Sequence, residues 1–298
     1  MFESITKNKI ISFLIVTMVT AFLMVIVYYV ANNFGMGMYA IPVAVAMAII
    51  STWSSYFFSD KIILSISGAR PADRNSDRKV REAMEGLCIA AGLPMPKVYI
   101  IEDKTANAFA TGRNPQNAVV AVTTGLLRKL NYYELEGVLA HELAHIGNRD
   151  ILLSAVVTVM IGIAVVLSDF FKRIFFFGGR TRSTKTSGHP IFMLIGLIFF
   201  VMAPIAGLLM RMALSRNREY LADATAVEFT RNPDGLIGAL RKLSDQENPV
   251  ENASNATSHL YIVNPFETCY FEAGKGFSGL FSTHPPIEKR IQALRNFK

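Results

Sequence analysis

His141-Glu142-Leu143-Ala144-His145 places two imidazoles and a carboxylate within five consecutive positions. In an α-helix, residues i and i+4 lie on one face about one turn apart, so both imidazoles can converge on one metal ion. Glu142 lies beside that face, where a carboxylate can take a proton from a metal-bound water. Catalytic zinc needs neutral imidazole ligands and one coordination position open to water. The pentapeptide therefore predicts a zinc site with His141 and His145 as ligands and Glu142 as general base.

The residues around this stretch favour a helix. Asn131-Tyr132-Tyr133-Glu134 has the pattern of a capping box, and leucine or valine follows at positions 135, 138, 139 and 143 as an apolar stripe. The chain has only five histidines, and two of them fall in this motif. The alternative is a chance match in an unrelated helix, and these observations weaken it.

A third ligand is available in the stretch 215–223, Ser-Arg-Asn-Arg-Glu-Tyr-Leu-Ala-Asp. Zinc enzymes often combine two histidines with one glutamate, which here is Glu219. Glu219 and Asp223 again lie at positions i and i+4. Asp223 can therefore accept the second N–H of a ligating histidine and fix its tautomer. Two arginines accompany these acids, and from spacing alone a solvated charged helix face remains an equal alternative.

Motifs of several other classes are absent. A metzincin would need Gly and His three and six positions after His145, where the chain has Asn148 and Ile151. No G-x-x-x-x-G-K-[ST] occurs, so no nucleotide is expected. The net charge of +7 comes without a nucleic-acid motif and suits an anionic membrane face. Cys88 and Cys269 form no C-x-x-C, and two isolated thiols fit a reducing cytoplasm.

Four apolar stretches without a charged residue occupy positions 10–31, 38–58, 151–168 and 191–210. Each approaches the ~20 residues that a helix needs to cross a bilayer. A content of 51% hydrophobic residues agrees with a membrane protein. The expected organisation is a transmembrane hairpin (1–58), the first part of a catalytic domain (59–150), a second apolar hairpin (151–210), and the second part of the catalytic domain with the third ligand (211–298).

The placement of basic residues predicts the orientation of these segments. Lys7 and Lys9 precede the first segment, four basic residues follow the second, and the connection 32–37 is uncharged. Basic residues stay on the cytoplasmic side, so the catalytic region is expected there. The connection 172–189 carries five basic residues, although full crossing of the second pair would place it outside. Full crossing and a shallow membrane hairpin both remain open.

A small α+β unit is predicted between the second apolar segment and the zinc motif. Residues 78–91 form an amphipathic helix that Gly92-Leu93-Pro94-Met95-Pro96 ends. Residues 97–101 form a strand, and 107–111 and 118–122 form a hairpin. Metalloproteases bind substrate as an added strand on a sheet edge, and 107–111 is the candidate edge strand. An ordinary core hairpin has equal support from propensity.

The C-terminal part offers a turn at Asn232-Pro233-Asp234-Gly235, a helix near 236–243, and a short helix ending near Arg295. Thr283-His284-Pro285-Pro286 precedes that last helix. A histidine ahead of two prolines lies on a rigid extended segment and can point at a site. A surface histidine is the alternative.

Together these motifs resemble the HtpX family of membrane-bound zinc metalloproteases, gluzincins related to the CAAX prenyl proteases. The likeness is carried by Pro94-Met95-Pro96-Lys97-Val98-Tyr99-Ile100 and by the stretches 107–112, 141–150, 218–223 and 283–286. The resemblance implies one Zn²⁺ per chain, with Glu142 catalytic and with the ligands His141, His145 and Glu219. It further implies that Asp223 contacts a metal ligand without binding the metal itself. His284 would then lie near the oxyanion, and Asn107 would lie on the substrate-binding strand.

The expected fold is α+β, a mainly helical zincin-type domain with a small β-sheet attached to a multi-pass helical membrane part. The resemblance implies a place in the bacterial inner membrane, with the catalytic domain facing the cytoplasm. It also implies that unfolded or damaged membrane proteins are the substrates and that the lipid bilayer is a partner. A catalytically silent zinc-binding scaffold is the alternative, because its ligands and helices would look the same.

Overall fold

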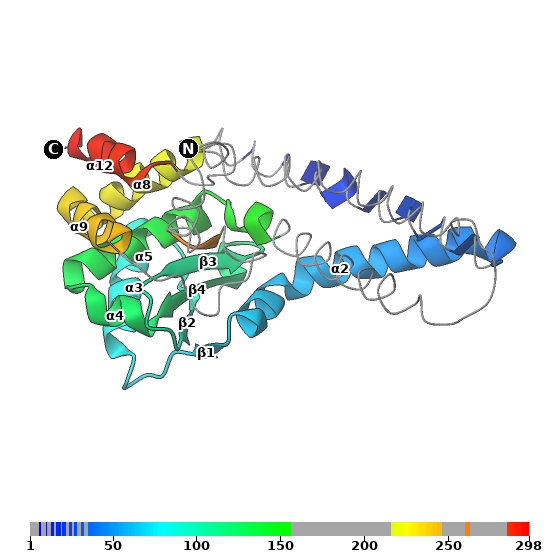
Figure 1. Ribbon diagram of the computed structural model, residues 1–298, viewed down its shortest axis with the longest axis horizontal. Coiled ribbons are helices and arrows are strands. Elements are labelled where there is room, and N and C mark those ends of the chain that lie inside the picture. The colour runs from blue at the N-terminus through cyan, green and yellow to red at the C-terminus, as the bar shows by residue number, and fades with distance from the viewer. Residues whose placement is uncertain are drawn as a thin grey trace, which may run out of the picture.

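The computed structural model describes residues 35–155, 216–245, 260–262 and 285–297, together with scattered positions between residues 6 and 32. Figure 1 shows their arrangement, and its labels are used below. After a short turn, η1 (Gly37–Tyr39), the long helix α2 (Ala40–Ile66) projects from a body formed by a small sheet and shorter helices. The helix therefore continues past residue 58, where the apolar run predicted its end.

Among the helices in the described part of the chain, none combines the length and the apolar character that crossing a bilayer requires. The predicted segment 191–210 and the connection 172–189 lie outside the described residues, as does 151–168 beyond residue 155. The predicted membrane hairpins and domain boundaries therefore stay predictions.

The sheet has four strands in the order β1-β2-β4-β3. β1 (Ala69–Pro71) pairs antiparallel with β2 (Lys97–Ile101), and β2 runs parallel to β4 (Ala118–Thr123). β3 (Ala108–Gly112) pairs antiparallel with β4 and lies at the end of this order. The short turn η2 (Pro115–Asn117) closes the hairpin. The predicted strand and hairpin are confirmed, with β3 beginning one residue later than expected.

Every residue of β4 is buried, because both faces of the sheet are covered. Val120 and Val122 face the main core, and Val119 and Ala121 face a second cluster that includes Ile63 of α2. A strand that is covered on both faces consists of a continuous run of apolar residues, and in β4 this run is Ala-Val-Val-Ala-Val.

The predicted helix 78–91 is confirmed as α3 (Arg78–Ala91), which ends at Gly92 in the left-handed region with φ +63°. After α4 (Thr124–Lys129), α5 (Tyr132–Gly147) begins at the predicted capping box. The Glu134 N–H donates to Asn131 Oδ1 at 3.0 Å, and the Asn131 N–H donates to Glu134 Oε2 at 2.8 Å. The start of the helix that carries the histidines is thus fixed by local chemistry.

Three further helices pack around α5: α8 (Arg216–Thr230), α9 (Pro233–Ser244) and, beyond them, α12 (Ile287–Arg295). α9 begins at the predicted turn, where Asn232 Oδ1 accepts the Gly235 N–H at 3.3 Å. The backbones of α5 and α9 approach closely at two glycines. A Cβ on Gly137 would lie 2.6 Å from Leu236 N, and one on Gly235 would lie 2.5 Å from Tyr133 O.

We expect Gly137→Ala to destabilise the fold by about 1–3 kcal/mol, because its methyl group meets backbone that cannot rotate away. The measurement is thermal unfolding of the purified protein, followed by circular dichroism. Gly86→Ala is the matched control in α3, since its methyl group would find no atom within 4 Å. There alanine should stabilise by about 0.5–1 kcal/mol. A Gly137→Ala protein that melts like Gly86→Ala would contradict the close α5–α9 contact.

Candidate metal centre

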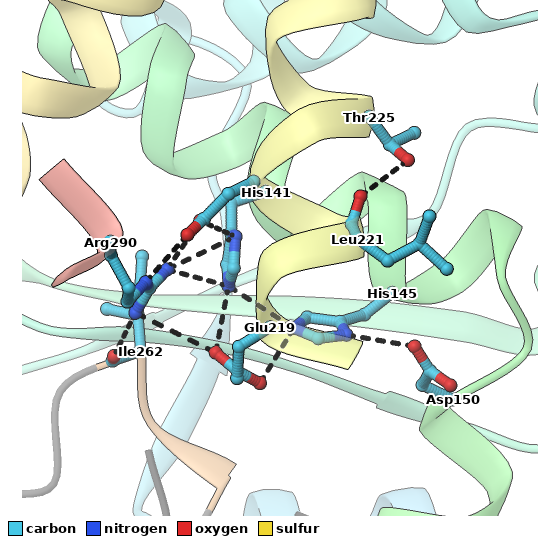
Figure 2. A network of polar contacts seen from close by, with 9 residues as sticks. His141, His145, Asp150, Glu219, Leu221, Thr225, Ile262 and Arg290 are labelled. Carbon is cyan, nitrogen blue, oxygen red and sulfur yellow. Dashed lines mark hydrogen bonds and ion pairs between the residues drawn. The ribbon is translucent and has the colours of Figure 1, made fainter. Parts of the chain in front are cut away.

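Three side chains from two helices converge at one buried point: His141 and His145 from α5, and Glu219 from α8 (Figure 2). His141 Nε2 lies 3.2 Å from His145 Nε2. The Glu219 oxygens lie 3.6 Å from His141 Nε2 and 3.5 Å from His145 Nε2. Ligand atoms about 2.0–2.1 Å from a tetrahedral zinc stand roughly 3.3 Å apart. The three groups therefore fit a common metal ion.

A carboxylate contacts the Nδ1 atom of each histidine, on the side of the ring away from the metal position. His141 Nδ1 lies 2.9 Å from Asp223 Oδ1, and His145 Nδ1 lies 3.2 Å from Asp150 Oδ2. When Nδ1–H donates to a carboxylate, the ring is fixed and Nε2 is directed toward the metal position. The structure thus places Asp223 where the i and i+4 spacing from Glu219 predicts it.

A turn at the end of α5 brings Asp150 back to His145. Arg149 adopts the left-handed region with φ +60°. The N–H of Asp150 donates to the carbonyl of His145 at 3.0 Å, and the N–H of Arg149 to that of Ile146 at 3.2 Å. This is the Schellman pattern, which usually has glycine at the left-handed position. No role for Asp150 was predicted from the sequence, because helical spacing does not place position i+5 on the face of His145.

Arg290 of α12 also contacts Asp223. It is fully buried, and its Nε and Nη2 donate to the two Asp223 oxygens at 2.8 and 2.7 Å. Its Nη1 donates to the carbonyl of Ile262 at 3.3 Å and lies 3.7 Å from Glu219 Oε2. Such a bidentate pair fixes both partners.

Arg290 was not predicted as a site residue, although the sequence contains a signal for it. In α12 the arginine lies at positions i+3 from Ile287 and i−4 from Leu294. It is therefore a charged residue on the apolar face of an amphipathic helix. A charge on such a face has to be paired when the helix packs against a core.

The cluster around the metal position is rich in negative charge. Asp150 also lies 3.6 Å from Arg218 Nε. Four buried carboxylates, those of Glu142, Asp150, Glu219 and Asp223, accompany the two guanidinium groups of Arg218 and Arg290. Four negative charges against two positive ones, with neutral imidazoles, leave a formal charge of about −2, which a divalent cation would compensate.

The pKa values of the cluster follow from this charge. Burial and the charge of Arg290 lower the pKa of His141, but Asp223 and Glu219 outweigh them and raise it to about 9. Burial raises the pKa of Glu142 above its ordinary value, against the charges of the two histidines and a backbone hydrogen bond from Ala110. A carboxylate with a raised pKa is better suited to accept and return a proton near neutral pH.

Two predicted site residues remain, Asn107 and His284, and the structure describes only Asn107. Asn107 is buried just before the edge strand β3, and its Oδ1 accepts the Ala108 N–H at 3.1 Å. His284 lies outside the described residues, although Pro285 and Pro286 directly precede α12.

We expect Arg290→Met to destabilise the protein by about 3–5 kcal/mol, because it leaves the Asp223 carboxylate buried without its guanidinium partner. Arg290→Lys should not restore stability, since one ammonium group cannot reproduce the bidentate pair. Arg295→Met is the matched control, because this arginine is exposed in the last turn of the same helix. Melting temperature is the measurement. Equal melting of the Arg290 and Arg295 variants would show that Arg290 does not hold Asp223.

Comparisons with known proteins agree with this geometry. Residues 74–298 match peptidase family M48. The chain is 42% identical over 294 residues to a Protease HtpX homolog of Dictyoglomus thermophilum, covering 99% of this chain and 94% of the relative. It is 41% identical over 313 residues to the Listeria monocytogenes homolog, covering 99% of both.

A solved structure shows a similar fold at low sequence identity. The crystal structure of Ste24p from S. mikatae has a TM-score of 0.52 and 17% identity, covering 97% of this chain and 67% of that chain. This likeness shows that the two chains share a fold. The family match over residues 74–298 and the full-length relatives show that the chain belongs to peptidase family M48 and, within it, to the HtpX proteases. The protein is therefore a metallopeptidase.

Proposed function

We propose that the chain is a zinc-dependent endopeptidase with His141, His145 and Glu219 as ligands and Glu142 as general base. The observation that carries this proposal is the set of ligand separations, 3.2, 3.5 and 3.6 Å, beside a buried glutamate. Bound zinc supplies the Lewis acidity that activates a water and polarises a carbonyl.

Side chains of the protein transfer the proton and orient the metal ligands. Glu142 accepts the proton of the attacking water and returns it to the leaving amine, and burial raises its pKa toward the range this needs. Asp223 and Asp150 keep the imidazoles oriented. His284 is proposed, from the resemblance, to stabilise the oxyanion. Asn107 is proposed as part of the substrate-binding strand, because it directly precedes the edge strand β3.

The cellular setting is proposed from the sequence. The four apolar segments and the basic residues around the first pair support a multi-pass protein of the bacterial inner membrane with its catalytic domain in the cytoplasm. Unfolded or damaged membrane proteins are the proposed substrates, and the role is proteolytic quality control.

We expect Glu142→Gln to retain bound zinc and the parent melting temperature but to lose hydrolysis of a denatured protein by about 10²–10⁴-fold, because it removes the base and no ligand. Glu219→Gln should instead lower the zinc content, measured by plasma mass spectrometry. Glu136→Gln, in the same helix but away from the site, is the matched control and should keep both zinc and activity.

The results separate the two functions that the sequence left open. If the parent protein binds zinc but cleaves no denatured protein, the chain is a zinc-binding scaffold. If Glu219→Gln keeps its full zinc content, another residue is the third ligand. If Glu142→Gln keeps its turnover, Glu142 is not the base.

The membrane topology has a direct test. We expect a single cysteine within residues 180–187, in a protein lacking Cys88 and Cys269, to react with an impermeant thiol reagent from outside intact cells. The length of the third and fourth apolar segments favours crossing, although the basic connection opposes it. A cysteine at Ser244 is the control and should react only after lysis. Labelling of the connection only after lysis would establish a hairpin at the cytoplasmic face.

A further inference from the structure

The backbone of β3 turns alternate residues toward opposite sides of the strand. Asn107 faces β4, because its N–H donates to Thr123 Oγ1 at 2.8 Å and its carbonyl accepts the Thr123 N–H at 3.0 Å. Hydrogen-bonding groups alternate along a strand, so those of Ala108 and Ala110 face the outer edge. An extended peptide that joined the sheet there would donate its N–H groups to the carbonyls of these two alanines.

This outer edge runs past the proposed catalytic base. The backbone of Ala110 is hydrogen-bonded to the Glu142 carboxylate, and α5 packs against β3. A peptide added to this edge would therefore bring its backbone beside Glu142.

Residues 260–262 already lie against the start of this edge. The N–H of Ile262 donates to the carbonyl of Ala108 at 3.0 Å. The Tyr261 ring stacks edge-on against Phe109, with centroids 5.2 Å apart, in the cluster that faces α2. Ile262 lies in the opposite cluster, together with Ala108 and the residues of α5. Tyr261 and Ile262 thus lie against opposite faces of the sheet, as two neighbouring residues of an added peptide would, whereas Leu260 shares the cluster of Tyr261.

Arg290 connects this segment to the metal centre. Its Nη1 donates to the carbonyl of Ile262, while its Nε and Nη2 hold Asp223. The segment is thus bound through its N–H to β3 and through its carbonyl to Arg290. Both contacts use only backbone atoms of Ile262, so any extended peptide can make them.

We propose that residues 260–262 hold the place of the substrate in the resting enzyme and leave it when an extended peptide binds. This inference rests on the proposed function and adds a substrate preference. The incoming peptide places a large aromatic side chain on Phe109 and, next to it, an aliphatic side chain toward α5. Its backbone carbonyl accepts from Arg290 in place of Ile262. The preferred substrates therefore contain an aromatic residue followed by an aliphatic one in an extended, unfolded stretch.

The proposal can be tested by binding, without catalysis. The probe is a fluorescent peptide of residues 258–264, Ser-His-Leu-Tyr-Ile-Val-Asn. Its affinity is measured by anisotropy for Glu142→Gln protein with and without Tyr261→Ala. The peptide should bind the Tyr261→Ala protein about tenfold more tightly, because the internal segment no longer competes well for the edge. Tyr261→Phe keeps the ring and is the matched control, with the affinity of Glu142→Gln alone.

Weaker or unchanged binding to the Tyr261→Ala protein would overturn the proposal. Either result would show that residues 260–262 are a permanent part of the site and do not leave it. A second measurement covers the case in which Tyr261→Ala fails to fold. The same peptide should competitively inhibit cleavage of a denatured protein by the unaltered chain. A peptide with proline at the Ile262 position lacks the N–H that bonds Ala108 and should inhibit at least about tenfold less.

Equal inhibition by the two peptides would also overturn the proposal. If the unaltered chain cleaves nothing, the proposed function fails, while the binding result with Glu142→Gln protein still decides the role of residues 260–262.

Discussion

The Asp223 carboxylate, buried where three helices meet, is the contact on which the site depends. It belongs to α8 and accepts a hydrogen bond from His141 of α5. It also accepts hydrogen bonds from both Nε and Nη2 of Arg290 in α12. Burial alone would raise its pKa, but Arg290 and His141 hold the pKa at about 2, so the group is ionised at neutral pH. One charge thus orients a histidine, anchors the C-terminal helix and joins parts of the chain far apart in sequence.

The same network explains why a divalent cation suits this position. The four buried carboxylates around this position outnumber the two guanidinium groups that accompany them. Buried charge is costly unless it is paired, so the cluster is matched to an ion and not to an apolar core. Arg290 also donates to the carbonyl of Ile262. The segment at the edge of β3 is therefore connected, through Arg290, to the Asp223 carboxylate that orients His141.

Local patterns predicted much of this structure. The capping box of α5, the glycine end of α3 and the i and i+4 pair of α8 depend only on neighbouring residues. Features that depend on distant segments were missed. β1 is three residues ending in proline and has no readable pattern, and its pairing with β2 is long-range. Asp150 reaches His145 only through a left-handed turn, and residues 260–262 meet β3 only in the folded chain.

The central claim is that two imidazoles and one carboxylate bind a single zinc ion. X-ray absorption at the zinc edge of the purified full-length protein tests it most directly. The account predicts two imidazole nitrogens and oxygen ligands at about 2.0–2.2 Å, without sulfur at about 2.3 Å. It also predicts that one oxygen contribution changes in Glu219→Gln protein. A sulfur ligand, or a spectrum that Glu219→Gln leaves unaltered at full occupancy, would contradict the account.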